Sequence, residues 1–508
     1  MLLMYCHAKL KNISQHTVIS AHLFLPDYSP MNRDSFYPAI ACFPLLLMLA
    51  GCAPMHETRQ ALSQQTPASQ VDTALPTALK NGWPDSQWWL EYHDNQLTSL
   101  INNALQNAPD MQVAEQRIQL AEAQAKAVAT QDGPQLDFSA DMERQKMSAE
   151  GLMGPFALND PAAGTTGPWY TNGTFGLTAG WHLDIWGKNR AEVTARLGTV
   201  KARAAEREQT RQLLAGSVAR LYWEWQTQAA LNTVLQQIEK EQNTIIATDR
   251  QLYQNGITSS VEGVETDINA SKTRQQLNDV AGKMKIIEAR LSALTNHQTK
   301  SLKLKAVALP KVASQLPDEL GYSLLARRAD LQAAHWYVES SLSTIDAAKA
   351  AFYPDINLMA FLQQDALHLS DLFRHSAQQM GVTAGLTLPI FDSGRLNANL
   401  DIAKAESNLS IASYNKAVVE AVNDVARAAS QVQTLAEKNQ HQAQIERDAL
   451  RVVGLAQARF NAGIIAGSRV SEARIPALRE RANGLLLQGQ WLDASIQLTG
   501  ALGGGYKR

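Results

Sequence analysis

The sequence has few cysteines and few aromatic residues. Its three cysteines, Cys6, Cys42 and Cys52, all lie near the start of the 508-residue chain. The rest of the chain therefore has no disulfide framework, no cysteine-ligated zinc and no thiol chemistry. Aromatic residues make up only 6% of the chain, while alanine, glutamine, leucine and asparagine fill long stretches. This composition is typical of extended helices rather than of a thick globular core.

The sequence also lacks a charge excess and the motifs of common enzymes. Its formal net charge is −2, whereas a nucleic-acid-binding protein normally carries a basic excess. It has no glycine-rich phosphate loop, no His-Glu-x-x-His and no Gly-x-Ser-x-Gly motif. His93 and His182 stand apart without a partner motif. We therefore expect a protein that is not an enzyme and that needs no metal, cofactor or nucleic acid.

A short apolar run near the start predicts an export signal. The run covers residues 39–50, ends in Leu-Ala-Gly-Cys at Cys52, and follows Met31 and Arg33. A positive charge, a short apolar run and small residues before a cut are typical of a secretory signal. Residues 49–52 resemble the bacterial lipobox, in which the cysteine is acylated. Ala53 after the cysteine resembles the sorting signal of outer-membrane lipoproteins. The alternative is a short membrane anchor with an incidental cysteine, but the run is short for a bilayer span.

The body of the chain is a tandem repeat. The segment 108–114 matches 328–334 at an offset of 220 residues. Gly187-Lys188 matches Gly394-Arg395, and the turn 253–257 matches 460–464, both at an offset of 207 residues. Matched blocks in the same order indicate two halves built alike. We expect an N-terminal extension that is non-native or mis-assigned (1–30), a signal (31–51), an acylated polar tether (52–77) and two repeats (78–300 and 301–508).

Each repeat is predicted to contain a helix, two strands joined by a long loop, a very long helix, a turn and a returning helix. No proline occurs between Asn189 and Leu309, and Leu214, Val218, Leu221 and Trp225 follow the spacing of a coiled-coil seam. The expected first helices are roughly Leu97–Thr130 and Leu331–Ala351. The expected strands are at about 135–143, 171–184, 355–363 and 381–390, with a loop at 144–168, and the long helices are at 188–255 and 395–462.

The strands alternate between apolar and polar residues, which leaves two interpretations open. An ordinary half-buried sheet shows this pattern, and so does a membrane barrel with lipid outside and water inside. Long loops between the strands favour the barrel. Four strands cannot close a barrel, so the strands would be pooled, and three protomers would give twelve. The predicted water-facing residues are Asp137, Ser139, Thr174, Thr178 and His182, and the predicted lipid-facing residues are Phe138, Leu177, Trp181 and Leu388.

These features together resemble the TolC family of outer-membrane efflux and secretion proteins. The specific matches are the patterns within Trp181–Lys188 and Leu388–Arg395. The other family-like residues are Trp83-Pro84 with Trp88-Trp89, Asp110 to Ala114 and the two Tyr/Phe-x-x-Gly turns. The resemblance implies a mainly α protomer with a membrane β-barrel. Three such protomers would form a twelve-stranded barrel in the outer membrane and a twelve-helix periplasmic tunnel. The implied function is drug efflux with a periplasmic adaptor and an inner-membrane transporter; the alternatives are type I protein secretion and a structural envelope lipoprotein.

The two hairpin turns are predicted to lie at the tunnel mouth. In this family such tips meet the adaptor, so Gly256, Thr258 and Gly463 are the docking candidates. The gate candidates follow the turns in the chain: Glu262, Glu265, Arg469 and Glu472. Arg469 departs from the paired acids that the family often carries, and an Arg–Glu bond between neighbouring hairpins would hold the mouth shut. The alternative is a solvated charged face that contributes little to stability.

Overall fold

The structure is a computed structural model. It describes residues 55, 62–64, 82–146, 148, 169–257, 259–296, 302–311, 324 and 326–506. The predicted extension and signal, Cys52, most of the tether, most of the first loop and Thr258 lie outside the described residues.

Two helices in the described part of the chain are far longer than the rest. They are α4 (Lys188–Gln254) and α8 (Arg395–Asn461), with 67 residues each, or a length of about 100 Å at the usual rise per residue. The sequence had placed them at 188–255 and 395–462. The remaining α-helices are α2 (Asn95–Asn107), α3 (Pro109–Ala129), α5 (Ser260–Leu294), α7 (Ala329–Ala350) and α9 (Gly467–Ala501).

The matched repeat motifs begin the two long helices. Gly187 and Gly394 precede α4 and α8 with φ of +77° and +86°, a region that favours glycine. An aspartate just upstream accepts hydrogen bonds from the first helical N–H groups. Asp184 accepts from Arg190 N at 2.9 Å, and Asp392 accepts from Leu396 N at 2.9 Å. Such capping satisfies backbone donors that have no partner inside the helix.

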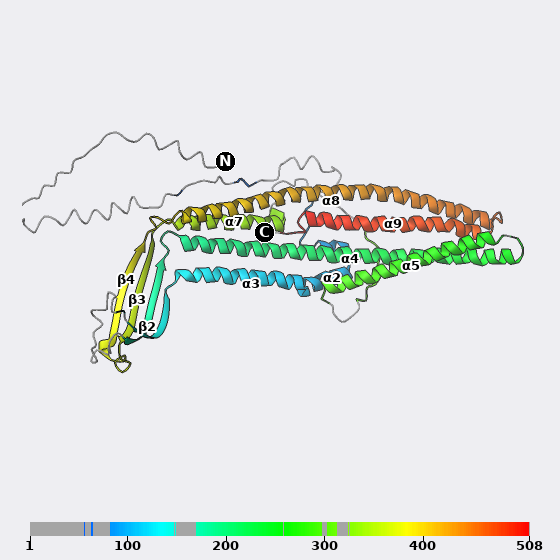
Figure 1. Cartoon of the computed structure of the whole chain (residues 1–508). Helices are drawn as coiled ribbons and strands as arrows, with labels where there is room; N and C mark the ends of the chain where they lie inside the picture. The colour runs from blue at the N-terminus through cyan, green and yellow to red at the C-terminus, as the bar shows by residue number, and fades with distance from the viewer. Residues whose placement is uncertain are drawn as a thin grey trace, which may run out of the picture. The chain divides into compact units, whose positions relative to one another are not determined.

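The helices lie side by side in one layer (Figure 1). α4 contacts α3 and α7 along one part of its length and α5 and α9 along the other, while α8 contacts α7 and α9. The order across the layer is therefore α3 or α5, then α4, then α7 or α9, then α8. Where α2 packs on this layer, a core forms around Leu97, Ile101, Tyr222 and Leu291, each of which is completely buried.

The predicted coiled-coil seam is buried. Leu214, Val218 and Trp225 all belong to this core, and Leu221 packs against it. The prediction of one helix over Leu97–Thr130 was wrong. Pro109 has no N–H to donate to a continuing helix and its ring disfavours a helical residue before it, so α2 ends before Ala108 and Pro109 starts α3.

Four strands form one antiparallel sheet in the order β1-β2-β3-β4. They are β1 (Gln135–Lys146), β2 (Trp169–Leu183), β3 (Asp355–Ala366) and β4 (Gln378–Thr387). Along the chain, β1 and β2 connect α3 to the long helix α4, and β3 and β4 connect α7 to the long helix α8. The fourth strand lies about three residues earlier than the predicted 381–390, because Pro389 lacks an N–H and cannot extend a strand ladder. Leu388, predicted to face lipid from this strand, therefore lies just beyond its end.

The sheet has one apolar and one mainly polar face. Phe138 pairs with Leu177, Leu177 with Leu362, and Leu362 with Met380, so these four side chains form one row. Phe138 is 67% exposed, so this part of the apolar face is largely uncovered by the other described residues. The register places Asp137, Ser139, Thr174, Thr178 and His182 on the opposite face.

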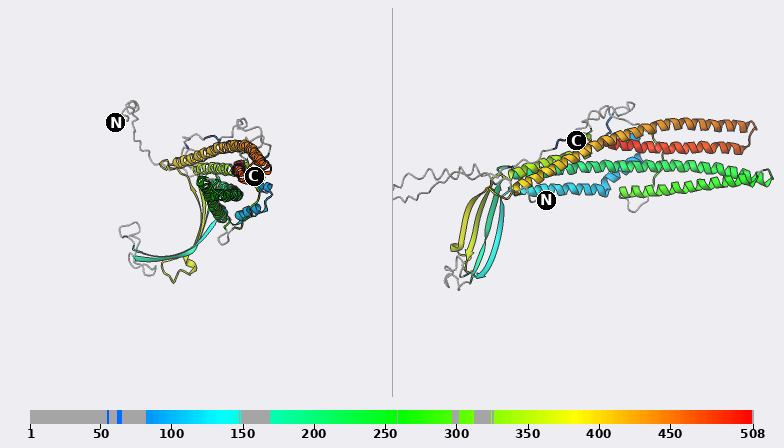
Figure 2. Two further views of the ribbon diagram at one scale, coloured as in Figure 1. Left: turned by 90° about the vertical axis from the view of Figure 1, so that its right-hand side faces the viewer. Right: turned by 45° about the horizontal axis from the view of Figure 1, so that its top comes forward.

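Glycines allow the polar face to be crowded. A Cβ on Gly176 would overlap Gln363, and a Cβ on Gly385 would overlap Asn357. A Cβ on Gly381 would come within 2.7 Å of the Phe361 ring. Glycine permits such close approach where a sheet bends. Figure 2 shows the strands bending in an arc.

Candidate channel mouth at the hairpin tips

Both helical hairpins turn through the same hydrogen-bonded motif. At the first tip Ile257 N donates to Leu252 O and Gly256 N donates to Tyr253 O, both at 2.9 Å. The second tip repeats these two bonds at Ile464 and Gly463. Gly256 and Gly463 have φ of +68° and +71°. This is the Schellman motif, which needs a left-handed residue after the helix and ends it sharply.

The structure places the four predicted gate residues in the first turns of α5 and α9. Glu262 and Glu265 are exposed on α5, beside the exposed apolar side chains of Val261 and Val264. Side chains three apart on a helix lie on the same face, so the two carboxylates lie together. Of the predicted docking residues, Gly256 and Gly463 stand at the two tips, one at each turn.

Arg469 bonds within its own helix. Its guanidinium lies 2.7 Å from the Glu472 carboxylate and its side chain is 68% exposed. This hydrogen bond raises the pKa of Arg469, and the negative charges of Asp249 and Glu262 on the first hairpin add to the effect. Arg469 was expected to bond to a glutamate of a neighbouring hairpin. Within one protomer it bonds instead to Glu472 of its own helix, α9. Arg469 nevertheless lies within the electrostatic reach of the first hairpin.

A different arginine connects the two hairpins. Arg474 of α9 donates to Glu241 of α4 at 3.3 Å and to Gln457 of α8 at 3.2 Å. The hydroxyl of Ser471, which is buried, donates to the same Glu241 carboxylate at 2.6 Å. Charge-assisted bonds of this kind are among the stronger ones in proteins. No local sequence pattern indicates this cluster, because Glu241 lies more than 200 positions away from both of its partners.

Two features are absent from the described residues. None of the helices is both long and apolar enough to cross a membrane. In the same part of the chain, no group of three His, Cys, Asp or Glu side chains is placed to hold a metal ion. The His182 ring lies 3.4 Å from the Asp355 carboxylate, at the end of the sheet nearest the helices. Both side chains are exposed.

Sequence comparison resolves the identity of this architecture. The pattern of the outer membrane efflux protein family matches residues 100–297 and 320–504, which are the two repeats. The chain belongs to the outer membrane efflux protein family. The resemblance to TolC-type proteins is therefore confirmed. Membership places the protein in the outer membrane as an efflux channel and not as an enzyme.

Members of this efflux family include close and distant relatives of the chain. The multidrug resistance outer membrane protein MdtQ of Escherichia coli O6:H1 is 99% identical over 478 residues, which is 94% of this chain and 100% of that protein. MdtP of Shigella flexneri, also named a multidrug resistance outer membrane protein, is 36% identical over 91% of this chain and 94% of its own. The Campylobacter jejuni CmeC outer membrane channel shares the fold, with a TM-score of 0.75 and 18% identity over 90% of this chain and 95% of that channel.

Proposed function

We propose that this protein is the outer-membrane exit duct of a multidrug efflux system. Three copies pool their strands into a twelve-stranded barrel and their helices into a twelve-helix periplasmic tunnel. An inner-membrane transporter supplies the energy and a periplasmic adaptor joins it to the duct. The names of the two curated relatives favour drugs over secreted proteins as cargo.

This proposal rests on the two open edges of the four-stranded sheet. Its order is β1-β2-β3-β4, so in the described chain β1 and β4 each have one edge without a strand partner. Unpaired backbone groups cannot remain in lipid, which leaves closure with other copies as the solution. The exposed apolar row from Phe138 to Met380 suits a lipid-facing surface, and the opposite polar face suits a water-filled lumen.

The sides of the helical layer also need partners. α8 forms one side, and Leu409, Leu450 and Leu455 along it are each more than 60% exposed. α5 forms part of the other side and exposes Val261 and Ile268. Apolar surface of this extent normally marks an interface. Neighbouring copies in the trimer would cover it, whereas a structural lipoprotein acting alone would leave it in water.

Roles for the mouth residues follow from this arrangement. We assign adaptor docking to the tips, at Gly256, Thr258 and Gly463. The gate comprises Glu262, Glu265, Arg469 and Glu472, with Glu241 and Arg474 added because they join the hairpins. Acylation of Cys52 anchors each protomer to the membrane.

Single-channel recording tests the proposed duct. The purified full-length protein, added to a planar lipid bilayer, is expected to give discrete conductance steps. Crosslinking should yield a species three times the protomer mass. A protein that remains a monomer and produces no steps would refute the duct and favour a structural lipoprotein.

The assignment of the two sheet faces predicts unequal effects of arginine. Leu177→Arg would place a charge in lipid and cost about 2–4 kcal/mol near the membrane midplane, whereas a lumen-facing arginine costs much less. Thr178→Arg is the matched control, because it changes the adjacent residue on the other face. Unfolding of both variants in lipid bilayers by denaturant measures the difference. Equal losses of stability would contradict the assignment.

A further inference from the structure

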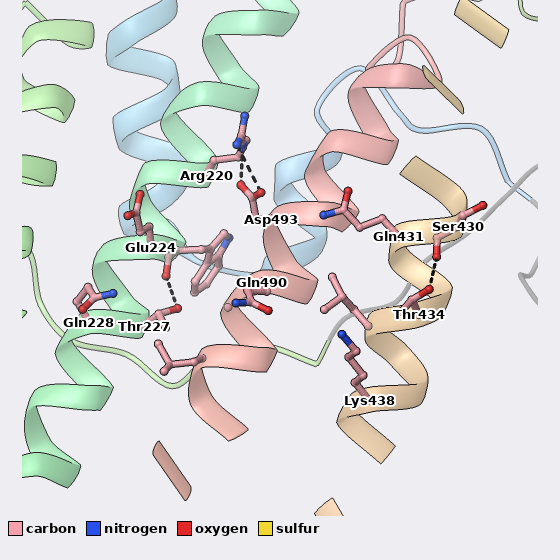
Figure 3. Close-up of a pocket in the computed structure, with 14 residues that line it drawn as sticks. Arg220, Glu224, Thr227, Gln228, Ser430, Gln431, Thr434, Lys438, Gln490 and Asp493 are labelled. Atoms are coloured by element: carbon pink, nitrogen blue, oxygen red, sulfur yellow. Dashed lines mark hydrogen bonds and ion pairs between the residues drawn. The ribbon is translucent and has the colours of Figure 1, made fainter. Parts of the chain in front are cut away.

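A polar groove of about 730 Å³ lies among α4, α8 and α9. α9 forms its floor and the two long helices form its walls (Figure 3). Gly489 on the floor has no side chain, and a Cβ there would lie 2.5 Å from the Thr227 hydroxyl. α9 therefore lies tightly against α4. Together with the small side chains of Ser430 and Thr434 on α8, this close approach leaves space between α9 and α8.

The groove opens on one particular face of the helical layer. On the other face the segment 302–311 is held by Gln226, which donates to Lys305 O at 2.9 Å, and by Gln488, which donates to Pro310 O at 3.0 Å. Gln490 lines the groove two residues after Gln488, a rotation of roughly 200° around the helix. Because segment 302–311 and α2 add bulk to one face only, the groove face is the one free to line a tunnel.

Opposite charges stand on the two walls of the groove. Figure 3 shows Glu224 on α4 and Lys438 on α8, with Gln490 of the floor between them. Both charged side chains are exposed, and neither forms an ion pair with another described residue. The remaining charges of the groove, Arg220 and Asp493, neutralise each other through a two-bond contact. The groove thus offers one available anion and one available cation.

Two buried polar groups at the groove have no hydrogen-bond partner among the described residues. Trp223 is only 2% exposed, and its indole N–H has no hydrogen-bond acceptor among the residues described. The buried Gln228 carbonyl oxygen, which also lines the groove, likewise has no donor. A buried polar group without a partner costs free energy. Neither atom is accessible to solvent, so both lie beneath the wall of the groove and are not contacts for a solute.

We propose that this groove is a binding site for small zwitterionic solutes in transit through the tunnel. Glu224 binds the ammonium group of the solute and Lys438 binds its carboxylate. The volume is in the range of pockets that hold drug-sized molecules. The inference rests on the proposed function, because only a duct would bring such solutes to this face.

A set of dansyl probes separates the charge classes. Nα-Dansyl-lysine is a zwitterion whose ammonium and carboxylate are separated by the lysine side chain. Dansylcadaverine is the matching cation, dansylglycine is an anion, and neutral dansylamide measures the partition of the dansyl group into detergent. Equilibrium dialysis against the purified full-length protein gives each dissociation constant. We expect the zwitterion to bind roughly fivefold more tightly than either singly charged probe, since exposed ion pairs are individually weak.

Two variants and two controls identify the groups responsible. Glu224→Gln should reduce zwitterion binding to the level of the anionic probe, and Lys438→Gln to that of the cationic probe. Lys240→Gln on α4 and Glu437→Gln on α8 remove exposed charges that do not line the groove, and should leave zwitterion binding unchanged. Equal affinities for the charged probes, or equal effects of groove and control variants, would overturn the inference.

Conductance of the same samples keeps the two proposals distinguishable. Channels that conduct normally but show no preference for the zwitterion refute the groove site and leave the duct intact. Protein that forms no channels refutes the duct itself, and the groove site with it. Crosslinking of Glu224→Gln and Lys438→Gln to the same trimer as the unaltered protein shows that both variants are folded, so that a loss of binding counts as support.

Discussion

The Arg474→Ala variant is expected to raise the single-channel conductance of the protein severalfold. Arg474 joins α4 to α8 through Glu241 and Gln457, so its removal takes away one polar contact of α9 with each long helix near the tips. The Glu241 carboxylate, 18% exposed at its side chain, then loses its cation and retains only the Ser471 hydroxyl. Removing one partner of a partly buried pair costs more than the pair itself contributes.

Matched variants show whether the contact or merely a positive charge matters. Arg479→Ala removes an exposed charge from the same helix, away from this contact, and should leave conductance unchanged. Arg469→Ala should raise conductance less than Arg474→Ala, because its bond to Glu472 is exposed and lies along one helix. Glu241→Gln should reproduce the effect of Arg474→Ala. If Arg474→Ala and Arg479→Ala conduct alike, Arg474 does not hold the mouth shut.

The elements that local sequence specifies were predictable. Gly187 and Gly394 follow capping aspartates, and Gly256 and Gly463 stand where a left-handed residue ends a helix. These requirements act within a few residues, so a single sequence displays them. The two sheet faces were equally readable for the residues of β1 and β2, because the period of a strand is set by its own side chains.

Features that depend on distant segments could not be predicted. Nothing in the spacing of Arg474 and Glu241 indicated that they meet, since α4 and α9 are brought together only by the fold. The groove beside Gly489 depends on the same packing. Two local errors had local causes. Pro109 disfavours a helical residue before it, which separates α2 from α3, and Pro389 has no N–H to extend a strand ladder, so β4 ends before it.

The lipid anchor predicted at Cys52 gives the second large effect. Acyl chains contribute roughly 0.8 kcal/mol per buried CH₂, so several chains hold a protein firmly in a bilayer. The stretch of chain between Cys52 and the first residues held against α8 is long enough for this role. Near the start of α8, Leu62 N donates to Asn408 at 2.9 Å and Asn415 donates to Ser63 O at 3.0 Å. Asn408 lies 13 residues into α8, or about 20 Å from its sheet-side end.

The ten residues from Cys52 to Leu62 span at most about 33–36 Å when extended. An acylated Cys52 therefore has enough chain to reach the membrane while Asn408 and Asn415 hold the tether against α8. We expect Cys52→Ala to accumulate as unprocessed precursor and to lose its acyl chains completely. Cys42→Ala, which changes a cysteine within the predicted signal, should be processed normally. Intact-mass measurement of the membrane fraction distinguishes the two. An unmodified N-terminus at Cys52 in the unaltered protein would exclude the anchor, and the strands alone would then have to hold the duct in the membrane.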